Sequence, residues 1–144
     1  MCFIKTIKLK ELERYYITNI LKEDKVVIKI LYKEPIDTFL FKKYRYYSPY
    51  ESYMYIKGEL NISPLGIHIT RTPYTWDLKV DIKITINEGF HSFLTKKDAD
   101  TYKTKLFNYQ EAVLCECIIP KGSTVVYNNS EIVSNQIIFI KELK

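Results

Sequence analysis

The sequence predicts an α+β fold with a mainly antiparallel sheet and two principal helices. Short β-branched or alternating segments follow one another along the chain, and only two segments space their apolar residues as a helix does. Successive strands interrupted by single helices are typical of antiparallel sheets. The 144 residues fit a single domain, residues 1–144.

The first half is predicted to begin with a helix and to continue as strands. Apolar residues from Leu9 to Ile20 fall at helical spacing, so we expect an amphipathic helix over residues 9–22. The β-branched run at residues 25–32 predicts a strand, and we expect Pro35 to end it. Three further strands are expected, at residues 38–47, 53–56 and 67–70.

The second half centres on the segment Gly89-Phe90-His91-Ser92-Phe93. Residues 80–86 before it alternate apolar and polar side chains, which predicts a half-buried strand. Gly89 allows an unusual backbone angle where this strand ends, and Phe90 and Phe93 are expected in the core. The segment is therefore predicted to join a strand to a helix.

A helix is predicted from Thr95, its N-cap, to about Leu106, because Asp98 completes a capping-box pattern. Strands follow, separated by turns with glycine, proline or asparagine. These strands are expected at residues 111–119, 124–127 and 137–140.

Composition and charge limit the classes of function. No apolar run approaches the roughly 18–20 residues that cross a bilayer, and the start turns polar too early for a signal peptide. The three cysteines are an odd number, unlike a secreted disulfide scaffold. We therefore expect a cytoplasmic protein without a membrane partner. The net charge of +5 suits an anionic partner, but with no recognition helix it does not favour duplex nucleic acid.

Basic and aromatic residues interleave over residues 42–50, and Tyr53 and Tyr55 follow. Tyr44, Arg45 and Tyr47 are candidate ligand contacts. Aromatic rings stack on bases, and cations meet phosphates. The alternative is a half-exposed strand, in which tyrosine is a favoured residue. The sequence therefore predicts either a nucleotide-binding surface or an ordinary strand at this place.

Four further candidates share the less regular region before residue 78. Arg71 can grip an anion with two hydrogen bonds, and Trp76 can stack on a ring. His68 and Tyr74 lie beside them in sequence. A packed surface loop is the alternative interpretation.

His91 is the last candidate, either as a phosphate donor or general base, or as a residue that fixes the turn through a backbone carbonyl. Catalysis by carboxylates is a further alternative, with Glu88, Glu111 or Glu116 as the acting residue. Cys115 and Cys117 should share one face of a strand, but no further ligands stand at zinc-like spacing, so core packing is the better account. Cys2 suits an N-terminal nucleophile, although the following residues lack the expected glycine.

Several short motifs occur in a fixed order along the chain. They are Ser48-Pro49-Tyr50, Gly58-Glu59-Leu60, the Gly89–Phe93 segment, residues 119–123 (IPKGS) and residues 132–138 (IVSNQII). In this order the chain resembles a group of small uncharacterised proteins of phages, prophages and Bacteroides-type bacteria, from about residue 25 to the end. The resemblance brings no catalytic residues. It implies a phage or mobile-element accessory protein acting in the host cytoplasm, with a possible anti-defence role.

The sequence favours binding over catalysis, with a nucleotide or other anionic small molecule as the expected ligand and no cofactor or metal. One alternative is an inhibitor that binds a host protein through the tyrosine-rich surface. Another is an enzyme acting on a nucleotide or ADP-ribose group, with His91 as acid or base. A homo-oligomer is compatible with the sequence.

Overall fold

The computed structural model describes residues 3–8, 19–37, 42–49, 53–71, 81–106 and 109–143. Antiparallel strands make up most of this part of the chain, and one α-helix accompanies them. The strands are β1 (Phe3–Lys8), β2 (Asn19–Ile20), β3 (Lys25–Asp37), β4 (Lys42–Tyr47), β5 (Met54–Tyr55), β6 (Leu60–Ile62), β7 (Gly66–Arg71), β8 (Asp81–Glu88), β9 (Phe90–Phe93), β10 (Ala112–Ile119), β11 (Thr124–Tyr127), β12 (Glu131–Ser134) and β13 (Gln136–Glu142). The helix α1 (Lys96–Lys103) and a 3₁₀ turn, η2 (Tyr109–Glu111), stand between β9 and β10.

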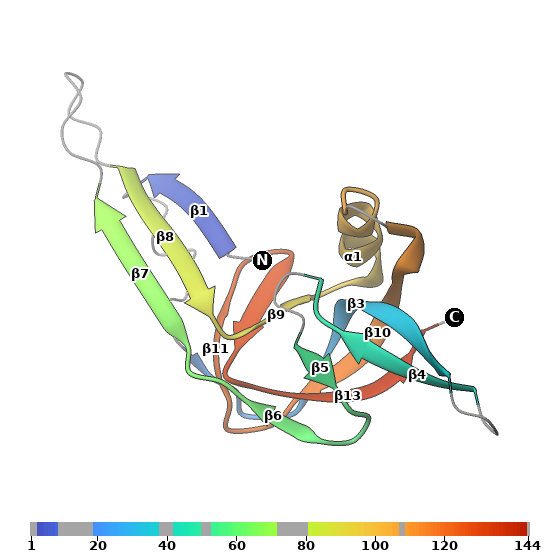
Figure 1. Cartoon of the computed structure of the whole chain (residues 1–144). Coiled ribbons are helices and arrows are strands. Elements are labelled where there is room, and N and C mark those ends of the chain that lie inside the picture. Colours follow the sequence, from blue (N-terminus) through green and yellow to red (C-terminus); the bar gives the residue numbers. More distant parts are fainter. Residues whose placement is uncertain are drawn as a thin grey trace.

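The described strands form two sheets (Figure 1). The larger sheet has the order β2-β11-β12-β9-β3-β10-β13-β6, and β4 pairs with β3 and carries β5 on its other side. The smaller sheet, β1-β8-β7, extends away from the larger one like an arm. β8 leads through Gly89 into β9, so the chain passes from the arm into the body at this glycine.

β3 supplies apolar side chains to a hydrophobic cluster on each of its faces. Val27 and Leu31 are fully buried in one cluster, together with Cys115, Cys117 and Phe139. Ile28 and Ile30, on the opposite face, pack with residues of α1 and β10. A strand alternates its side chains between two faces, so this near-continuous apolar run indicates that both faces are covered.

The helix expected over residues 9–22 is wrong at its C-terminal end. Asn19 and Ile20 form β2 and pair with Val125 and Thr124 of β11, whereas residues 9–18 lie outside the described part of the chain. The Leu21 amide also donates to the Ser123 carbonyl at 3.0 Å. These long-range backbone hydrogen bonds outweigh the helical spacing of the local sequence, as tertiary contacts often do.

Pro35 does not end its strand, contrary to the expectation. β3 runs on to Asp37, and Pro35 faces Tyr44 of β4. The β10 ladder along β3 stops at Tyr32, so β3 has β4 as its neighbour beyond that point in the described chain. Proline lacks a backbone N–H, and a strand segment paired on one side tolerates this.

The Gly89–Phe93 segment is partly as expected. Phe90 and Phe93 are buried, and Thr95 caps α1 by accepting a hydrogen bond from the Asp98 amide at 3.2 Å. Residues 90–93 are themselves a strand rather than a plain junction, because β12 pairs with all four of them. Gly89 has a φ of +123°, a value that side chains oppose.

The strands at residues 112–119 and 124–127 agree closely with expectation, and the closing strand is longer than expected. Strands β1, β6 and β12 were not expected. β6 is three residues long, and β12 follows the Asn128 turn directly, so neither shows a clear alternation of its own. In the described residues no helix is long and apolar enough to cross a membrane.

Candidate ligand-binding pocket

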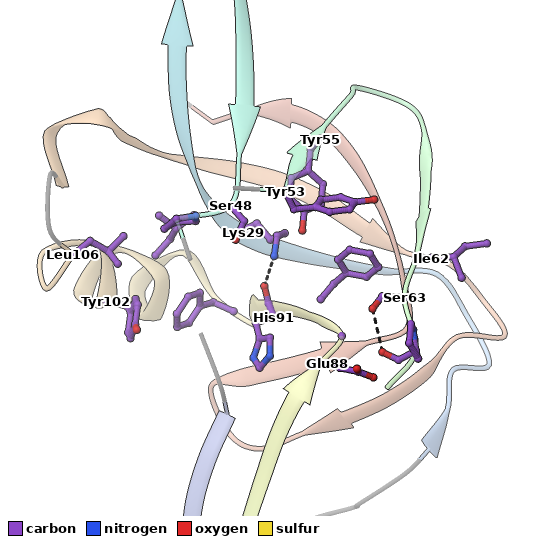
Figure 2. Close-up of a pocket in the computed structure, with 16 residues that line it drawn as sticks. Lys29, Ser48, Tyr53, Tyr55, Ile62, Ser63, Glu88, His91, Tyr102 and Leu106 are labelled. Atoms are coloured by element: carbon purple, nitrogen blue, oxygen red, sulfur yellow. Dashed lines mark hydrogen bonds between the residues drawn. The ribbon is translucent and has the colours of Figure 1, made fainter. Parts of the chain in front are cut away.

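A pocket of about 510 Å³ opens where β9 separates from β3. These two strands pair at one position, Ile28 with Phe93. Beyond this pair β9 follows β12 instead, which leaves space lined by both strands and by residues of β5, β6 and α1. We call this space the Lys29 pocket, since the Lys29 side chain extends toward its centre (Figure 2).

Lys29 is 6% exposed and stands on the same face of β3 as Val27 and Leu31. Its ammonium donates a hydrogen bond to the His91 backbone carbonyl at 2.6 Å and lies 5.3 Å from the centre of the Tyr55 ring. Removing an ammonium from water is costly unless polar and aromatic partners replace the water. These contacts supply part of that replacement and fix the positive charge in the pocket wall.

Three aromatic rings form one side of the pocket. Tyr53 lies edge-on to Tyr55, with ring centres 5.0 Å apart, and each packs against Phe90. Asn61 of β6 positions Tyr53: its Oδ1 accepts from the Tyr53 hydroxyl at 3.0 Å, and its Nδ2 donates to the Ile137 carbonyl at 3.2 Å. The buried amide therefore ties the aromatic wall to the sheet.

Two further rings, Phe93 and Tyr102, line the pocket from the side of α1, with centres 5.3 Å apart. Tyr102 reaches the pocket because Thr95 and Asp98 start α1 in the turn directly after β9. Ser48 and Ser63 add hydroxyl groups to the lining. An aromatic lining with a few polar groups is typical of small-molecule sites, whose volumes are about 300–1,000 Å³.

His91 lines the pocket and is uncharged near neutral pH. Burial and, to a smaller extent, the neighbouring Lys29 charge lower the pKa of its imidazole to about 3. An imidazole with so low a pKa is a weak general base. It stands within β9, several residues before the Thr95 cap, so it is not one of the groups at the start of α1.

Glu88 is the carboxylate of the pocket. It is exposed at the end of β8, whereas Lys29 is buried. Water screens an exposed charge much more than a buried one. The Lys29 charge therefore dominates inside the pocket, while Glu88 can accept hydrogen bonds from hydroxyl or amino groups at the opening.

Tyr44 and Arg45 lie elsewhere, in a shallower depression of about 420 Å³ along β4 and β5. The Lys33 ammonium lies 4.2 Å from the centre of the Tyr44 ring. The guanidinium Nε of Arg45 is 3.4 Å from Glu34 Oε2, in an exposed pair that contributes little to stability. Tyr47 packs edge-on against Tyr32, with ring centres 5.6 Å apart.

None of the remaining candidates lines the pocket in the part of the chain that the structure describes. His68 and Arg71 are in β7 of the small sheet, where their backbones pair with Thr85 and Ile82. Tyr74 and Trp76 lie outside the described residues, as does Cys2. Of the eight candidates, the structure therefore places His91 at the Lys29 pocket and Tyr44 and Arg45 at the β4 depression, and Tyr47 lines neither of these two.

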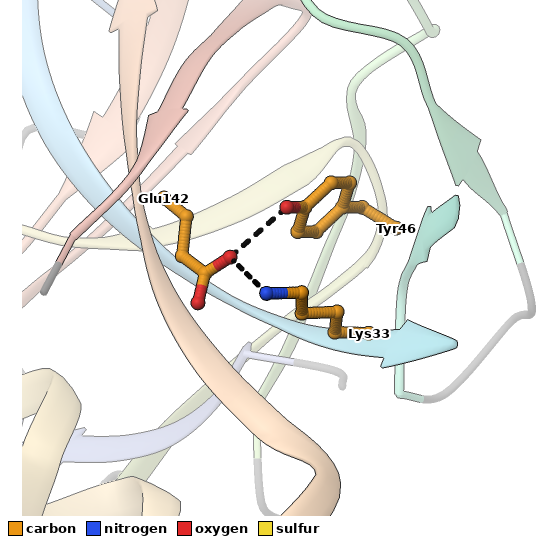
Figure 3. A network of polar contacts seen from close by, with 3 residues as sticks. All are labelled: Lys33, Tyr46 and Glu142. Carbon is orange, nitrogen blue, oxygen red and sulfur yellow. Dashed lines mark hydrogen bonds and ion pairs between the residues drawn. The ribbon is translucent and has the colours of Figure 1, made fainter. Parts of the chain in front are cut away.

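Glu142 joins the end of β13 to β3 and β4 (Figure 3). Its Oε2 accepts from the Tyr46 hydroxyl at 2.9 Å and pairs with the Lys33 ammonium at 2.8 Å. Burial raises the pKa of the Glu142 carboxyl, but the hydrogen bonds from Lys33 and Tyr46 outweigh it and hold the pKa below its usual value. Burial and the Glu142 hydrogen bond raise the pKa of Tyr46 to about 12.

Cys115 and Cys117 are free and buried in the same cluster, as the strand pattern predicts. Burial raises the pKa of both thiols, to about 12 for Cys117, so they remain protonated and pack as small apolar groups. Among the described residues, no three histidine, cysteine or acidic side chains lie close enough together to hold a metal ion.

Lys29 was not among the predicted site residues, although the sequence contains a signal for it. Lys29 interrupts a run of apolar residues at a position that alternation assigns to the face of Val27 and Leu31. A lysine on a core face needs a polar partner or a cavity. Comparison with known proteins adds nothing to the site: no family model, no curated protein and no solved structure matches this chain.

Proposed function

We propose that the Lys29 pocket binds a small anionic ligand that carries a planar ring, with nucleotides as the first class to test. The observation that supports this most is the fixed ammonium of Lys29 beside the ring of Tyr55, in a space of about 510 Å³. A cation in a water-poor wall attracts phosphate or carboxylate, and aromatic rings favour a flat apolar group.

The charge of Lys29 acts on the groups around it. It lowers the pKa of His91 and opposes the rise in the pKa of Cys115 and Cys117. An anion entering the pocket would experience the same positive potential. The neutral imidazole of His91 lines the pocket without adding charge. It can donate a hydrogen bond to a ligand or accept one from it.

The proposed activity is binding without turnover. His91 is a weak base at its low pKa, so an acid–base role for this residue is not supported. Capture of a ligand also agrees with the sequestering role that the resemblance to phage proteins implies, which stays a prediction.

Titration calorimetry with mono-, di- and cyclic nucleotides tests the proposal. We expect at least one of them to bind the wild type and to bind Lys29→Met at least tenfold more weakly. Lys25→Met is the matched control, because Lys25 is exposed on the same strand and should leave binding unchanged. Folded protein that binds none of these compounds, or that binds equally after Lys29→Met, contradicts the proposal.

A further inference from the structure

In the part of the chain that the structure describes, the outer edge of β4 has no neighbouring strand along Lys42–Arg45. β5 pairs with β4 at Tyr46 and Tyr47 and goes no further, while Lys42 to Arg45 pair with β3 on their other side. After β5 the chain turns away at Gly58, whose amide donates to the Phe139 carbonyl at 2.8 Å. An open edge of this kind presents backbone N–H and C=O groups to a partner.

The depression of about 420 Å³ lies along this edge and has a distinct chemistry. Met54 and Ile56 line it and are 51% and 53% exposed. Exposed apolar side chains gathered beside an open strand edge are typical of interaction sites. We call this depression the β4 groove.

Among the described residues, the β4 groove is lined by three cations and by no carboxylate. The cations are Lys43, Arg45 and Lys57. Glu34 outside the groove offsets part of the Arg45 charge through the exposed 3.4 Å contact. Lys43 and Lys57 leave the groove positive, so the complementary partner is acidic. Apolar anchors with a charged rim match the usual anatomy of a protein interface.

We propose that the β4 groove binds an extended acidic protein segment, which adds to the sheet as a strand beside Lys42–Arg45. The added strand would continue the line of β5, with apolar side chains against Met54 and Ile56 and carboxylates beside Lys43 and Lys57. Strand addition derives affinity from backbone hydrogen bonds and specificity from alternate side chains. The β4 groove shares Tyr55 with the Lys29 pocket, but Lys43, Met54, Ile56 and Lys57 line the groove alone, and the proposal does not depend on a ligand in the pocket.

A protein segment suits the groove better than single-stranded nucleic acid does. Nucleic acid binding needs ring faces on which bases stack. Tyr44 is the exposed ring of the groove, and the Lys33 ammonium already lies 4.2 Å from its centre. Met54 and Ile56 offer apolar contact without a ring, which favours valine- or leucine-like side chains.

Fluorescence anisotropy with a labelled decapeptide of alternating glutamate and valine tests the proposal. We expect this peptide to bind, and the double variant Lys43→Glu/Lys57→Glu to bind at least tenfold more weakly. The control Lys96→Glu/Lys97→Glu carries the same charge change on exposed residues of α1 and should bind as the wild type does. No binding of the decapeptide, or equal loss in both double variants, overturns the proposal.

Backbone methylation of the probe separates strand addition from simple charge attraction. Two versions of the decapeptide carry N-methyl groups on alternate residues, one version for each edge of the peptide. We expect one version to lose at least tenfold in affinity and the other to bind nearly as well as the parent. Equal affinities overturn strand addition. Binding of a ten-residue uridine oligonucleotide in place of the peptide would assign the groove to nucleic acid and overturn the proposal as well.

Discussion

The Lys29 ammonium donates to the His91 backbone carbonyl across 2.6 Å, and this bond joins β3 to β9 where their ladder has already stopped. The bond has two consequences. It holds together two strands that separate to form the pocket, and it keeps a positive charge in the pocket wall.

Replacing Lys29 by methionine should raise the pKa of His91 above its value of about 3. The Lys29 charge is one of the causes that lower this pKa, and methionine removes it. Burial is the larger cause and remains, so the pKa should stay below the usual 6.5. An NMR titration of the imidazole protons measures the shift, and Lys25→Met serves as the control. An unchanged pKa would show that the charge does not reach the pocket.

Replacing His91 by asparagine should reduce the loss of stability in acid. The pKa of His91 is about 3 in the folded protein and about 6.5 in the unfolded chain, so the unfolded chain binds the proton first as the pH falls. The wild type should lose on the order of 4 kcal/mol from this group between pH 6.5 and pH 3. Urea unfolding at several pH values measures the difference between the two proteins. Parallel pH profiles would contradict it.

Replacing Tyr46 by phenylalanine should remove an alkaline loss of stability. The pKa of Tyr46 is raised from 10.0 to about 12, so the unfolded chain ionises first and the wild type loses stability as the pH rises between these values. At neutral pH the variant should be about 1 kcal/mol less stable, because the Glu142 carboxylate loses a hydrogen bond. Chemical denaturation at neutral and alkaline pH tests this. Tyr47→Phe is the control and should keep the alkaline loss.

Replacing Gly89 by alanine should destabilise the protein by more than about 2 kcal/mol. A Cβ there would lie 2.8 Å from Val133 Cγ1 and 2.9 Å from Leu65 Cδ1, at a φ of +123°. Gly58→Ala is the matched control, because Gly58 also has a positive φ but has open space around it. That control should cost about 1 kcal/mol. Equal losses in urea unfolding would show that the close contacts do not matter.

Much of the fold follows from local patterns in the sequence. Thr95 and Asp98 mark the start of α1, and alternation from Val113 to Ile119 marks a strand, because caps and periodicity depend on neighbouring residues. The pairing of Asn19 and Ile20 with β11 could not be predicted in this way. That pairing depends on residues about a hundred positions further along the chain.

The candidate site was predictable only in part. His91 was identified from its own segment, and the tyrosines near residue 50 were recognised as a group. Their separation into the Lys29 pocket and the β4 groove depends on how β5 pairs with β4 and how β9 leaves β3. Neither event leaves a signature in residue spacing. For Lys29 the sequence does contain a local signal, because strand alternation places this lysine on a core face.

Backbone amide NMR during titration with a nucleotide that binds in calorimetry shows whether the ligand occupies the Lys29 pocket. We expect chemical-shift changes centred on Lys29, on Tyr53 and Tyr55, and on residues 88–93, with the largest changes lost in Lys29→Met. Changes centred on Lys43–Arg45 and Lys57, with the Lys29 pocket silent, would contradict it.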